Sequence, residues 1–488
     1  MLGGIPSFSS SASAANCTDV DGTTATISAD CTDLDIQGDN ADVTINSGVT
    51  VSASSTAVNS TGSGTITAIT NNGTIDVTGK TAFANDTTIN TLTNTGTISA
   101  SNHWGLKSGS SSAYIGTLNN SGTISTGNHN GLINQNSATI NELINSGTIS
   151  ASVNKGLINN SSATINTLTN TGTISATTQY GLRNDNESTI TTLTNSGNIQ
   201  ANINGLYNKS STITTLTNIG FIKALTGDFG LNNAGGTIGT LDNSGTISAN
   251  DDSSLWNGGT ITTLTNSDTG TISAEDEFGL KNVNGTISTL TNSGTISAGD
   301  RYGIFNDGTS IITTLTNSGT ISSDRSGLWN DATITTLTNS GSIKALTGDF
   351  GLKNVNGTIV TLTNSGTISA GDDYGLYNDG TATITILTNT GTISASGNGI
   401  SIWNDTTSTI TTLNNSQGDL TYKGKLPTNY NVIINSTSDF GKITFSSVSG
   451  TLNFGISSLS DLCEVCEETT YSSVVSGLSS SNIDSTSG

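Results

Sequence analysis

The sequence predicts an all-β fold, a parallel β-solenoid of about 25 residues per coil. A Leu in a TLTN-like motif recurs fourteen times from Leu92 to Leu413, at spacings of 22 to 26 residues. Each copy contains short runs of Thr and Ile, which are β-branched strand formers, separated by Asn and Gly turn residues. A disordered linker would not keep apolar residues in such a register.

One copy illustrates how a coil is built. Ile190 and Leu193 belong to a first segment, Ile199 to a second and Leu206 to a third, with turn residues between them. We therefore expect three short strands per coil, roughly fourteen regular coils, and parallel pairing of neighbouring coils at ~4.8 Å. The winding is predicted to be right-handed from the rule for parallel crossover connections. A coil can bury its Ile and Leu only against its neighbours, so the ends need caps.

The repeat divides the chain into four parts. Residues 1–15 are predicted to be a signal-peptide remnant or a disordered leader, because Ala12-Ser13-Ala14 resembles a signal-peptidase site. Residues 16–70 form an N-terminal β cap and residues 71–419 the solenoid repeats. Residues 420–488 form a C-terminal β cap that leads to a missing downstream region.

Four cysteines lie near the two ends of the chain: Cys17, Cys31, Cys463 and Cys466. In a secreted protein they are disulfide candidates, one staple at each end. The alternative is free thiols in a reducing cell. A zinc site is disfavoured, since there is no second CxxC motif and the two His residues are distant in sequence.

Stacking turns each repeated position into a column. The Asn after the recurrent Leu is predicted to form a hydrogen-bonded ladder, because stacked amides bond to one another and Asn tolerates left-handed turns. This structural Asn ladder includes Asn170, Asn195, Asn218, Asn243, Asn292, Asn317, Asn339, Asn364 and Asn389. A second Asn column follows the GL motif, at positions such as Asn208 and Asn330. The Gly that follows the first column, as at Gly172, Gly245, Gly319 and Gly366, is expected to supply positive φ.

Acidic, aromatic and hydroxyl residues also recur, and each set has two interpretations. Asp side chains before the GL motif are either solvated or bridged by calcium, with Asp276, Asp300, Asp324 and Asp372 as the weak calcium candidates. Aromatic residues beside them, such as Phe278 and Trp329, pack between coils or stack on sugars. Threonines flanking the apolar positions are either ordinary solvent-facing strand residues or an ice-ordering array, which would require one flat, uniform face.

The composition of the chain limits the classes of partner and reaction that are expected. The formal net charge is −22 with only 10% charged residues, which argues against nucleic acid or an anionic membrane as partner and fits an extracellular polymer. The sequence contains no arrangement of Ser, His and Asp that indicates a catalytic triad, and we expect no cofactor. The acid pair Asp372-Asp373 would suit a glycosidase, but it lies inside the repeating column.

The NSGTISA coils, followed by LPTNYNVIINSTSDFGKITF, resemble the passenger region of bacterial autotransporter proteins over residues from about 17 to 480. The resemblance implies a β-helical passenger carried to the cell surface by a C-terminal outer-membrane β-barrel, which this chain lacks. It implies an extracellular or cell-surface location, and membrane attachment only through that missing barrel. The implied partner is a host or environmental surface, a glycan or a neighbouring cell.

These observations together predict a non-catalytic adhesin or structural stalk that is secreted or displayed at the cell surface. Contact would arise from weak features repeated along the rod. The alternatives are a glycan- or ice-binding solenoid and a polysaccharide-cleaving β-helix enzyme.

Overall fold

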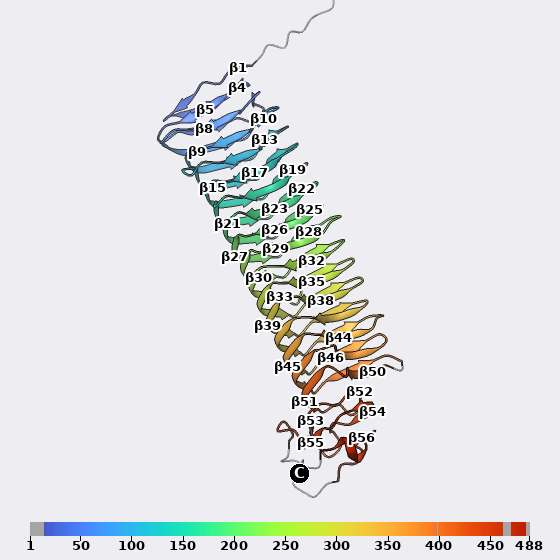
Figure 1. Ribbon diagram of the computed structural model, residues 1–488. Helices are drawn as coiled ribbons and strands as arrows, with labels where there is room; N and C mark the ends of the chain where they lie inside the picture. The colour runs from blue at the N-terminus through green and yellow to red at the C-terminus, as the bar shows by residue number, and fades with distance from the viewer. Residues whose placement is uncertain (1–13, 398, 462–469, 485–488) are drawn as a thin grey trace, which may run out of the picture.

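The chain folds into a rod of stacked coils, running from the N-terminal to the C-terminal end of the molecule (Figure 1). The computed structural model describes residues 14–397, 399–461 and 470–484. Each coil contributes one strand to sheet A, then one to sheet B, then one to sheet C, and each strand pairs in parallel with its counterpart in the next coil. The all-β parallel solenoid predicted from the sequence is confirmed.

The strand bounds follow the repeat in each sheet. Sheet A consists of β1 (Ala15–Asn16), β4 (Cys31–Thr32), β7 (Thr50–Ala53), β10 (Thr74–Val77), β13 (Thr97–Ala100), β16 (Thr123–Thr126), β19 (Thr148–Ala151), β22 (Thr173–Ala176), β25 (Asn198–Ala201), β28 (Phe221–Ala224), β31 (Thr246–Ala249), β34 (Thr271–Ala274), β37 (Thr295–Ala298), β40 (Thr320–Ser323), β43 (Ser342–Ala345), β46 (Thr367–Ala370) and β49 (Thr392–Ala395). Sheet B consists of β2 (Val20–Asp21), β5 (Leu34–Gln37), β8 (Val58–Ser60), β11 (Phe83–Asn85), β14 (Leu106–Ser108), β17 (Asn130–Asn134), β20 (Lys155–Asn159), β23 (Tyr180–Asp185), β26 (Asn204–Lys209), β29 (Phe229–Ala234), β32 (Ser253–Asn257), β35 (Phe278–Val283), β38 (Tyr302–Asp307), β41 (Ser326–Asn330), β44 (Phe350–Val355), β47 (Tyr374–Asp379), β50 (Ile400–Asn404), β52 (Leu420–Lys425), β54 (Ile443–Ser449) and β56 (Val475–Ser476). Sheet C consists of β3 (Thr24–Ile27), β6 (Asp42–Ile45), β9 (Thr65–Asn71), β12 (Thr88–Asn94), β15 (Tyr114–Asn120), β18 (Thr139–Asn145), β21 (Thr164–Asn170), β24 (Thr189–Asn195), β27 (Thr212–Asn218), β30 (Thr237–Asn243), β33 (Thr260–Asn266), β36 (Thr286–Asn292), β39 (Ile311–Asn317), β42 (Thr333–Asn339), β45 (Thr358–Asn364), β48 (Thr383–Asn389), β51 (Thr409–Asn415), β53 (Asn429–Val432) and β55 (Asn453–Ile456).

The rod contains more coils than the sequence repeat alone indicates. Sheet A has 17 strands, which at ~4.8 Å between strands gives a rod of about 80 Å. The additional coils come from residues before the TLTN-like repeat, since β1 pairs in parallel with β4, β4 with β7 and β7 with β10. The TLTN-like motif is missing from these first coils, although they contribute strands to the same three sheets.

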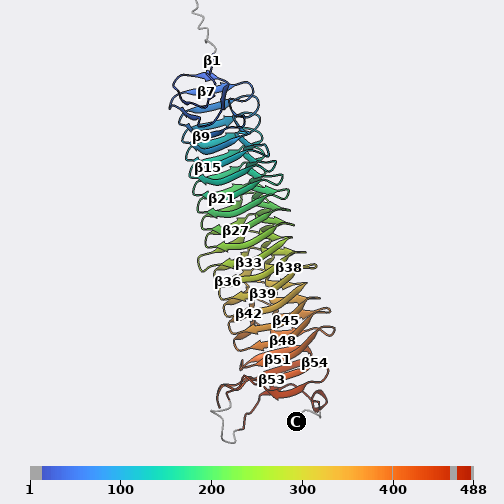
Figure 2. The ribbon, with the colours of Figure 1, turned by 90° about the vertical axis from the view of Figure 1, so that its left-hand side faces the viewer.

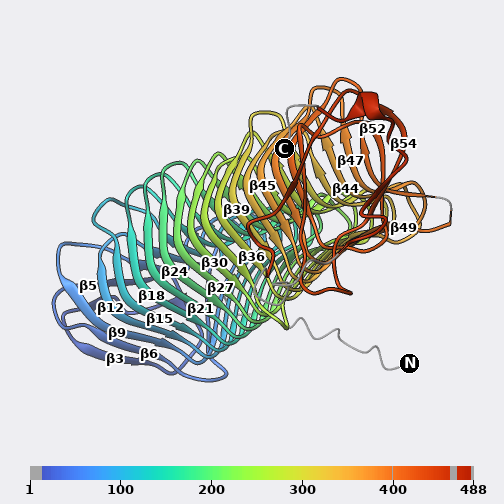
Figure 3. The same ribbon diagram turned by 90° about the horizontal axis from the view of Figure 1, so that it is seen from below.

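The rod changes character near its C-terminal end. Sheet A ends at β49, whereas sheets B and C continue through β52, β53, β54 and β55. Tyr422, Tyr430 and Phe445 are buried in the core there, and the Phe445 ring contacts the ring of each tyrosine. A 3₁₀ turn, η2 (Ser480–Asn482), follows β56. The two terminal regions are seen at opposite ends of the stack when the rod is viewed from below (Figure 3).

The core is a continuous column of Ile and Leu. The four predicted inward residues of one coil, Ile190, Leu193, Ile199 and Leu206, are fully buried. The next coil places Ile213, Leu216, Ile222 and Leu231 directly beneath them, and these residues are also fully buried. Each such side chain contributes ~1.5–3 kcal/mol of apolar burial, which depends on the neighbouring coil.

Two ladders of buried Asn side chains accompany this core. In the first, the Asn195 Nδ2 donates to Asn218 Oδ1 at 2.8 Å, to the carbonyl of Gly197 at 3.2 Å and to the carbonyl of Phe221 at 3.1 Å. The ladder runs from Asn71 to Asn415 and contains all nine Asn residues singled out in the sequence. The second ladder runs from Asn134 to Asn404.

The prediction of positive φ at the ladder Asn and at the Gly that follows it is wrong. The structure gives a different reason why Asn and Gly occupy these positions. The residues with positive φ include Asn186 and Asn356 in the turns after sheet B, but neither the ladder Asn residues nor Gly172, Gly245, Gly319 and Gly366. A Cβ on Gly319 would lie 2.2 Å from the carbonyl oxygen of Gly294 in the preceding coil. Gly is therefore required at this corner because successive backbones approach closely, and Asn is required for its paired donor and acceptor.

Candidate functional surfaces

Sheet B carries the most varied side chains of the rod. Strand register stacks one outward-facing residue of each coil above the next. This outward column of sheet B contains Lys107, Ile133, Ile158, Arg183, Tyr207, Asn232, Trp256, Lys281, Phe305, Trp329, Lys353, Tyr377, Trp403 and Lys423. In its C-terminal half, from Lys281 to Lys423, two aromatic residues separate each lysine from the next.

The rings of this column are partly exposed, but their faces contact neighbouring side chains. Tyr377 and Trp403 stack with centroids 4.9 Å apart. Lys353 Nζ lies 4.3 Å from the Trp329 centroid, 4.6 Å from that of Phe350 and 5.1 Å from that of Tyr377. Because a sugar stacks on an open ring face, these covered faces favour the packing interpretation of the aromatic set.

The acidic residues before sheet B lie on successive coils, as the sequence predicts. The backbone N–H of Asp300 donates to the carbonyl of Asp276 at 2.8 Å, and that of Thr347 donates to the carbonyl of Asp324 at 3.3 Å. The backbone N–H of Asp372 donates to the carbonyl of Gly348 at 3.1 Å. The four calcium candidates thus share one edge of the rod.

Basic side chains already neutralise part of this acidic edge. Lys281 pairs with Asp252 at 3.0 Å and Arg301 with Glu277 at 3.1 Å. Arg325 lines a hollow of about 300 Å³ together with Asp300, Asp324 and Asp349. Calcium takes six to eight oxygen ligands, and over the described ranges no group of three or more His, Cys, Asp or Glu side chains is arranged to hold a metal ion.

The acid pair lies at a recess near the point where sheet A ends. Asp372, Asp373, Tyr374, Gly399, Ile400, Lys423, Ser446 and Ser447 line a cavity of about 420 Å³. Burial, followed by the charges of Asp372 and Asp349, raises the pKa of the Asp373 carboxyl above its ordinary value. The recess combines residues of the last repeats with Lys423 of β52 and Ser446 and Ser447 of β54, a combination that the sequence did not reveal.

The strands of sheet C, among them β15, β21, β27 and β33, follow one another along the rod in Figure 2. Their register aligns threonines in two columns of partly exposed residues. Thr192 stacks on Thr215, and Thr194 stacks on Thr217, with the buried Leu column between them. The threonines of the repeat are spread over strands of sheet A and sheet C. Within sheet C, parallel register aligns the same strand position in successive coils, so its threonines share one face. The Thr residues of sheet A lie on a separate face.

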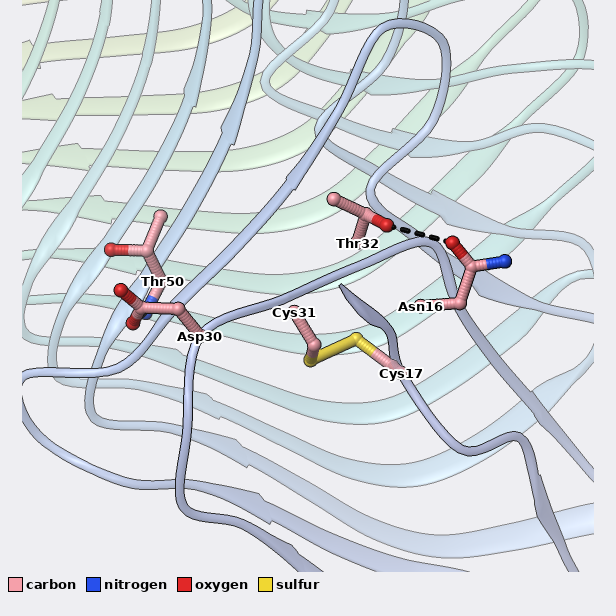
Figure 4. The surroundings of a disulfide bond; sticks show 6 residues. All are labelled: Asn16, Cys17, Asp30, Cys31, Thr32 and Thr50. Carbon is pink, nitrogen blue, oxygen red and sulfur yellow. Dashed lines mark hydrogen bonds between the residues drawn. A yellow bond between two sulfur atoms is a disulfide. The ribbon is translucent and has the colours of Figure 1, made fainter. Parts of the chain in front are cut away.

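The N-terminal coils are joined covalently. Cys17 and Cys31 form a disulfide, and Thr32 Oγ1 donates a hydrogen bond to Asn16 Oδ1 beside it (Figure 4). The linked residues lie in adjacent coils, since β1 pairs with β4. Cys463, Cys466 and the leader residues 1–13 lie outside the described residues.

Sequence reasoning identified the aromatic residues of sheet B but missed the cations between their rings. Lys281, Lys353 and Lys423 each lie within 4.8 Å of an aromatic centroid. The signal that could have revealed them is the GLKN motif, which places Lys281 and Lys353 at the same repeat position as Trp256, Trp329 and Trp403.

No protein-family model matches the sequence, and no similar curated protein or solved structure was found. Across the residues that the structure describes, no helix has the length and apolar character needed to cross a membrane.

Proposed function

We propose that this chain is a secreted or cell-surface rod that acts as an adhesin or structural stalk without catalysing a reaction. The observation that carries the proposal is the unbroken stacking of coils in register from β1 to β49. In a stack of this kind each additional coil lengthens the rod by one strand spacing. Any surface feature is therefore held at a fixed distance from the end of the rod.

The N-terminal disulfide supports an extracellular location. Disulfides persist in oxidising compartments and are uncommon in the reducing cytosol. Cys17 and Cys31 join the first coils, where a solenoid lacks a neighbour on one side. The resemblance of the NSGTISA coils to autotransporter passengers is consistent with the same location.

The stalk is tested by imaging the purified full chain by negative-stain electron microscopy. We expect straight particles of at least about 80 Å, the length that the 17 strands of sheet A require at ~4.8 Å each. Compact or flexible particles would contradict both the stalk and the adhesin, because either role needs a rigid rod.

Adhesion is tested with beads that carry the full chain, presented to bacterial and animal cells, abiotic surfaces and a glycan array. Weak repeated contacts predict that retention falls gradually as pairs of whole coils are deleted. An abrupt loss on removing one coil pair would indicate a single tight site instead. Straight rods that bind nothing in this panel would leave the stalk as the function and exclude the adhesin for those surfaces.

A polysaccharide-cleaving enzyme is the second candidate, favoured by the carboxylate pair in the recess near the end of sheet A. Glycosidases use two carboxyl groups, one of them with a raised pKa. Glycans from the array are incubated with wild type and with Asp372→Asn/Asp373→Asn and analysed for new reducing ends. Cleavage that the variant loses would replace the non-catalytic proposal.

A further inference from the structure

The threonine columns of sheet C form a surface unlike the other faces of the rod. From β21 to β45 the first column is unbroken and contains Thr167, Thr192, Thr215, Thr240, Thr263, Thr289, Thr314, Thr336 and Thr361. The second column lies two residues further along each strand and contains Thr169, Thr194, Thr217, Asp242, Thr265, Thr291, Thr316, Thr338 and Thr363. We call these two columns the threonine array.

The array is nearly free of charge on a strongly acidic protein. The fifteen strands from β9 to β51 of sheet C contain Glu142 and Asp242 as their only charged residues, and no Lys or Arg. The acidic and basic residues instead gather along sheet B and its preceding turns. A charged polymer or ion would therefore find no counter-charge on sheet C.

The hydroxyl groups of the array are available to a ligand. The array threonines are partly exposed, as shown by Thr263, Thr289, Thr314, Thr336 and Thr361. Within the described part of the chain, no side-chain hydrogen bond joins an array hydroxyl to another protein group, whereas Thr117 outside the array bonds to Glu142. Each free hydroxyl can both donate to and accept from an external oxygen.

The array also has fixed spacings in two directions. Neighbouring coils separate hydroxyls by ~4.8 Å, and residues two apart on a strand separate them by ~7 Å. Thr is stiff at χ1, so its methyl and hydroxyl keep one orientation, whereas Ser in the corresponding columns of sheet A has no methyl to restrain it. Continuous backbone pairing and the Leu column hold the strands beneath the array in place.

From these observations we infer that sheet C binds the surface of ice. A neutral lattice of alternating hydroxyl and methyl groups is suited to anchoring ordered water, and both spacings are comparable to oxygen repeats on faces of hexagonal ice. A crystalline polysaccharide is the less suitable occupant, because the array contains no aromatic ring to stack on sugars, whereas the outward column of sheet B contains several. This activity is additional to the proposed stalk, and electron microscopy tests the stalk separately.

The test measures thermal hysteresis and the partition of fluorescently labelled full chain into slowly growing ice. Wild type is expected to separate the melting and freezing points, to shape crystals and to enter the ice. The variant Thr289→Lys/Thr314→Lys, in the middle of the array, should lose all three effects. The matched control is Ser297→Lys on sheet A, whose column already contains Lys223 and Lys344. It should behave like wild type.

A second variant keeps the test valid if the double lysine substitution impairs folding. Thr289→Ser/Thr314→Ser retains both hydroxyls but removes the methyls that orient them, so a narrower hysteresis gap is expected with unchanged circular dichroism. Absence of hysteresis and ice partition in folded wild type would overturn the inference. Retention of both by folded Thr289→Lys/Thr314→Lys, or sedimentation with cellulose or chitin but not with ice, would overturn it equally.

Discussion

Asn134 begins the second Asn ladder with an acceptor that has no donor. Its Nδ2 donates to Asn159 Oδ1 at 2.9 Å, but its own Oδ1 is buried without a hydrogen-bond partner. The preceding coil places Ser108 at this position, and Ser108 is the acceptor for Asn85 at 3.4 Å. A hydroxyl is shorter than an amide, so the ladder is interrupted at one residue.

Replacing Ser108 with Asn should repair this interruption. Asn at position 108 would accept from Asn85 and donate to Asn134, as neighbouring rungs do. Because leaving a buried polar group unpaired costs about 1–3 kcal/mol, we expect the free energy of unfolding to rise by about that amount. Denaturant titration followed by circular dichroism measures the change. Ser108→Ala is the control, expected to be less stable than wild type, and a Ser108→Asn protein no more stable than wild type would contradict the account.

At the scale of the element, the unit of the structure is a whole coil rather than a strand. Strands β39, β40 and β41 pair with β42, β43 and β44 in sheets C, A and B, respectively, at the same repeat positions. Thr286, Ile311 and Thr333 occupy one column of sheet C. A coil can therefore be removed without shifting any column, although a part of a coil cannot.

Deletion of residues 311–332 joins Ser310 to Thr333 and removes one whole coil. This deletion tests whether the coil is the structural unit of the rod. We expect a folded rod shortened by ~4.8 Å, with stability lowered by one coil and its interface. Small-angle X-ray scattering measures the length, and thermal unfolding measures the stability. The control deletes residues 311–319, which removes β39 alone and should prevent cooperative folding. Equal tolerance of both deletions would show that the coil is not the unit.

At the scale of the whole molecule, the acidic residues are concentrated along sheet B and its preceding turns, where their mutual repulsion opposes folding. The formal net charge is −22. Burial and neighbouring carboxylates raise the pKa of Asp228, Asp331 and Asp373 above their ordinary values. These groups bind a proton more tightly in the folded rod than in the unfolded chain, so they favour the folded state at low pH and lose that effect as pH rises through their folded pKa.

We therefore expect Asp373→Asn to flatten the decline in unfolding temperature between about pH 4 and neutral pH, because it removes one group whose folded pKa is raised. Differential scanning calorimetry across this range measures the slope for wild type and variant. Asp19→Asn, at the N-terminal end, changes the net charge equally and serves as the control. A steeper decline in Asp373→Asn, or the same flattening in Asp19→Asn, would contradict the assignment.

The sequence by itself determined the coil, because Ile190, Leu193, Ile199 and Leu206 recur at spacings that only stacked strands can bury together. It also determined the Asn ladders, since a regular column of amides has few other uses in a repeat. The features that the sequence did not determine are those that depend on contacts between coils. Positive φ was expected at Gly319, whereas the carbonyl of Gly294 in the preceding coil is what excludes a side chain there.

The candidate surfaces also depended on tertiary structure. The sequence placed aromatic and acidic residues in columns, but only the three-dimensional register showed lysines covering the ring faces and Arg325 lying among carboxylates. It showed equally that sheet C gathers its threonines on one nearly uncharged face and that a recess forms near the end of sheet A. The repeat fixes which residues lie above one another. The path of each coil decides which columns share a face, because residues far apart along one coil are brought together only when its three strands close around the core.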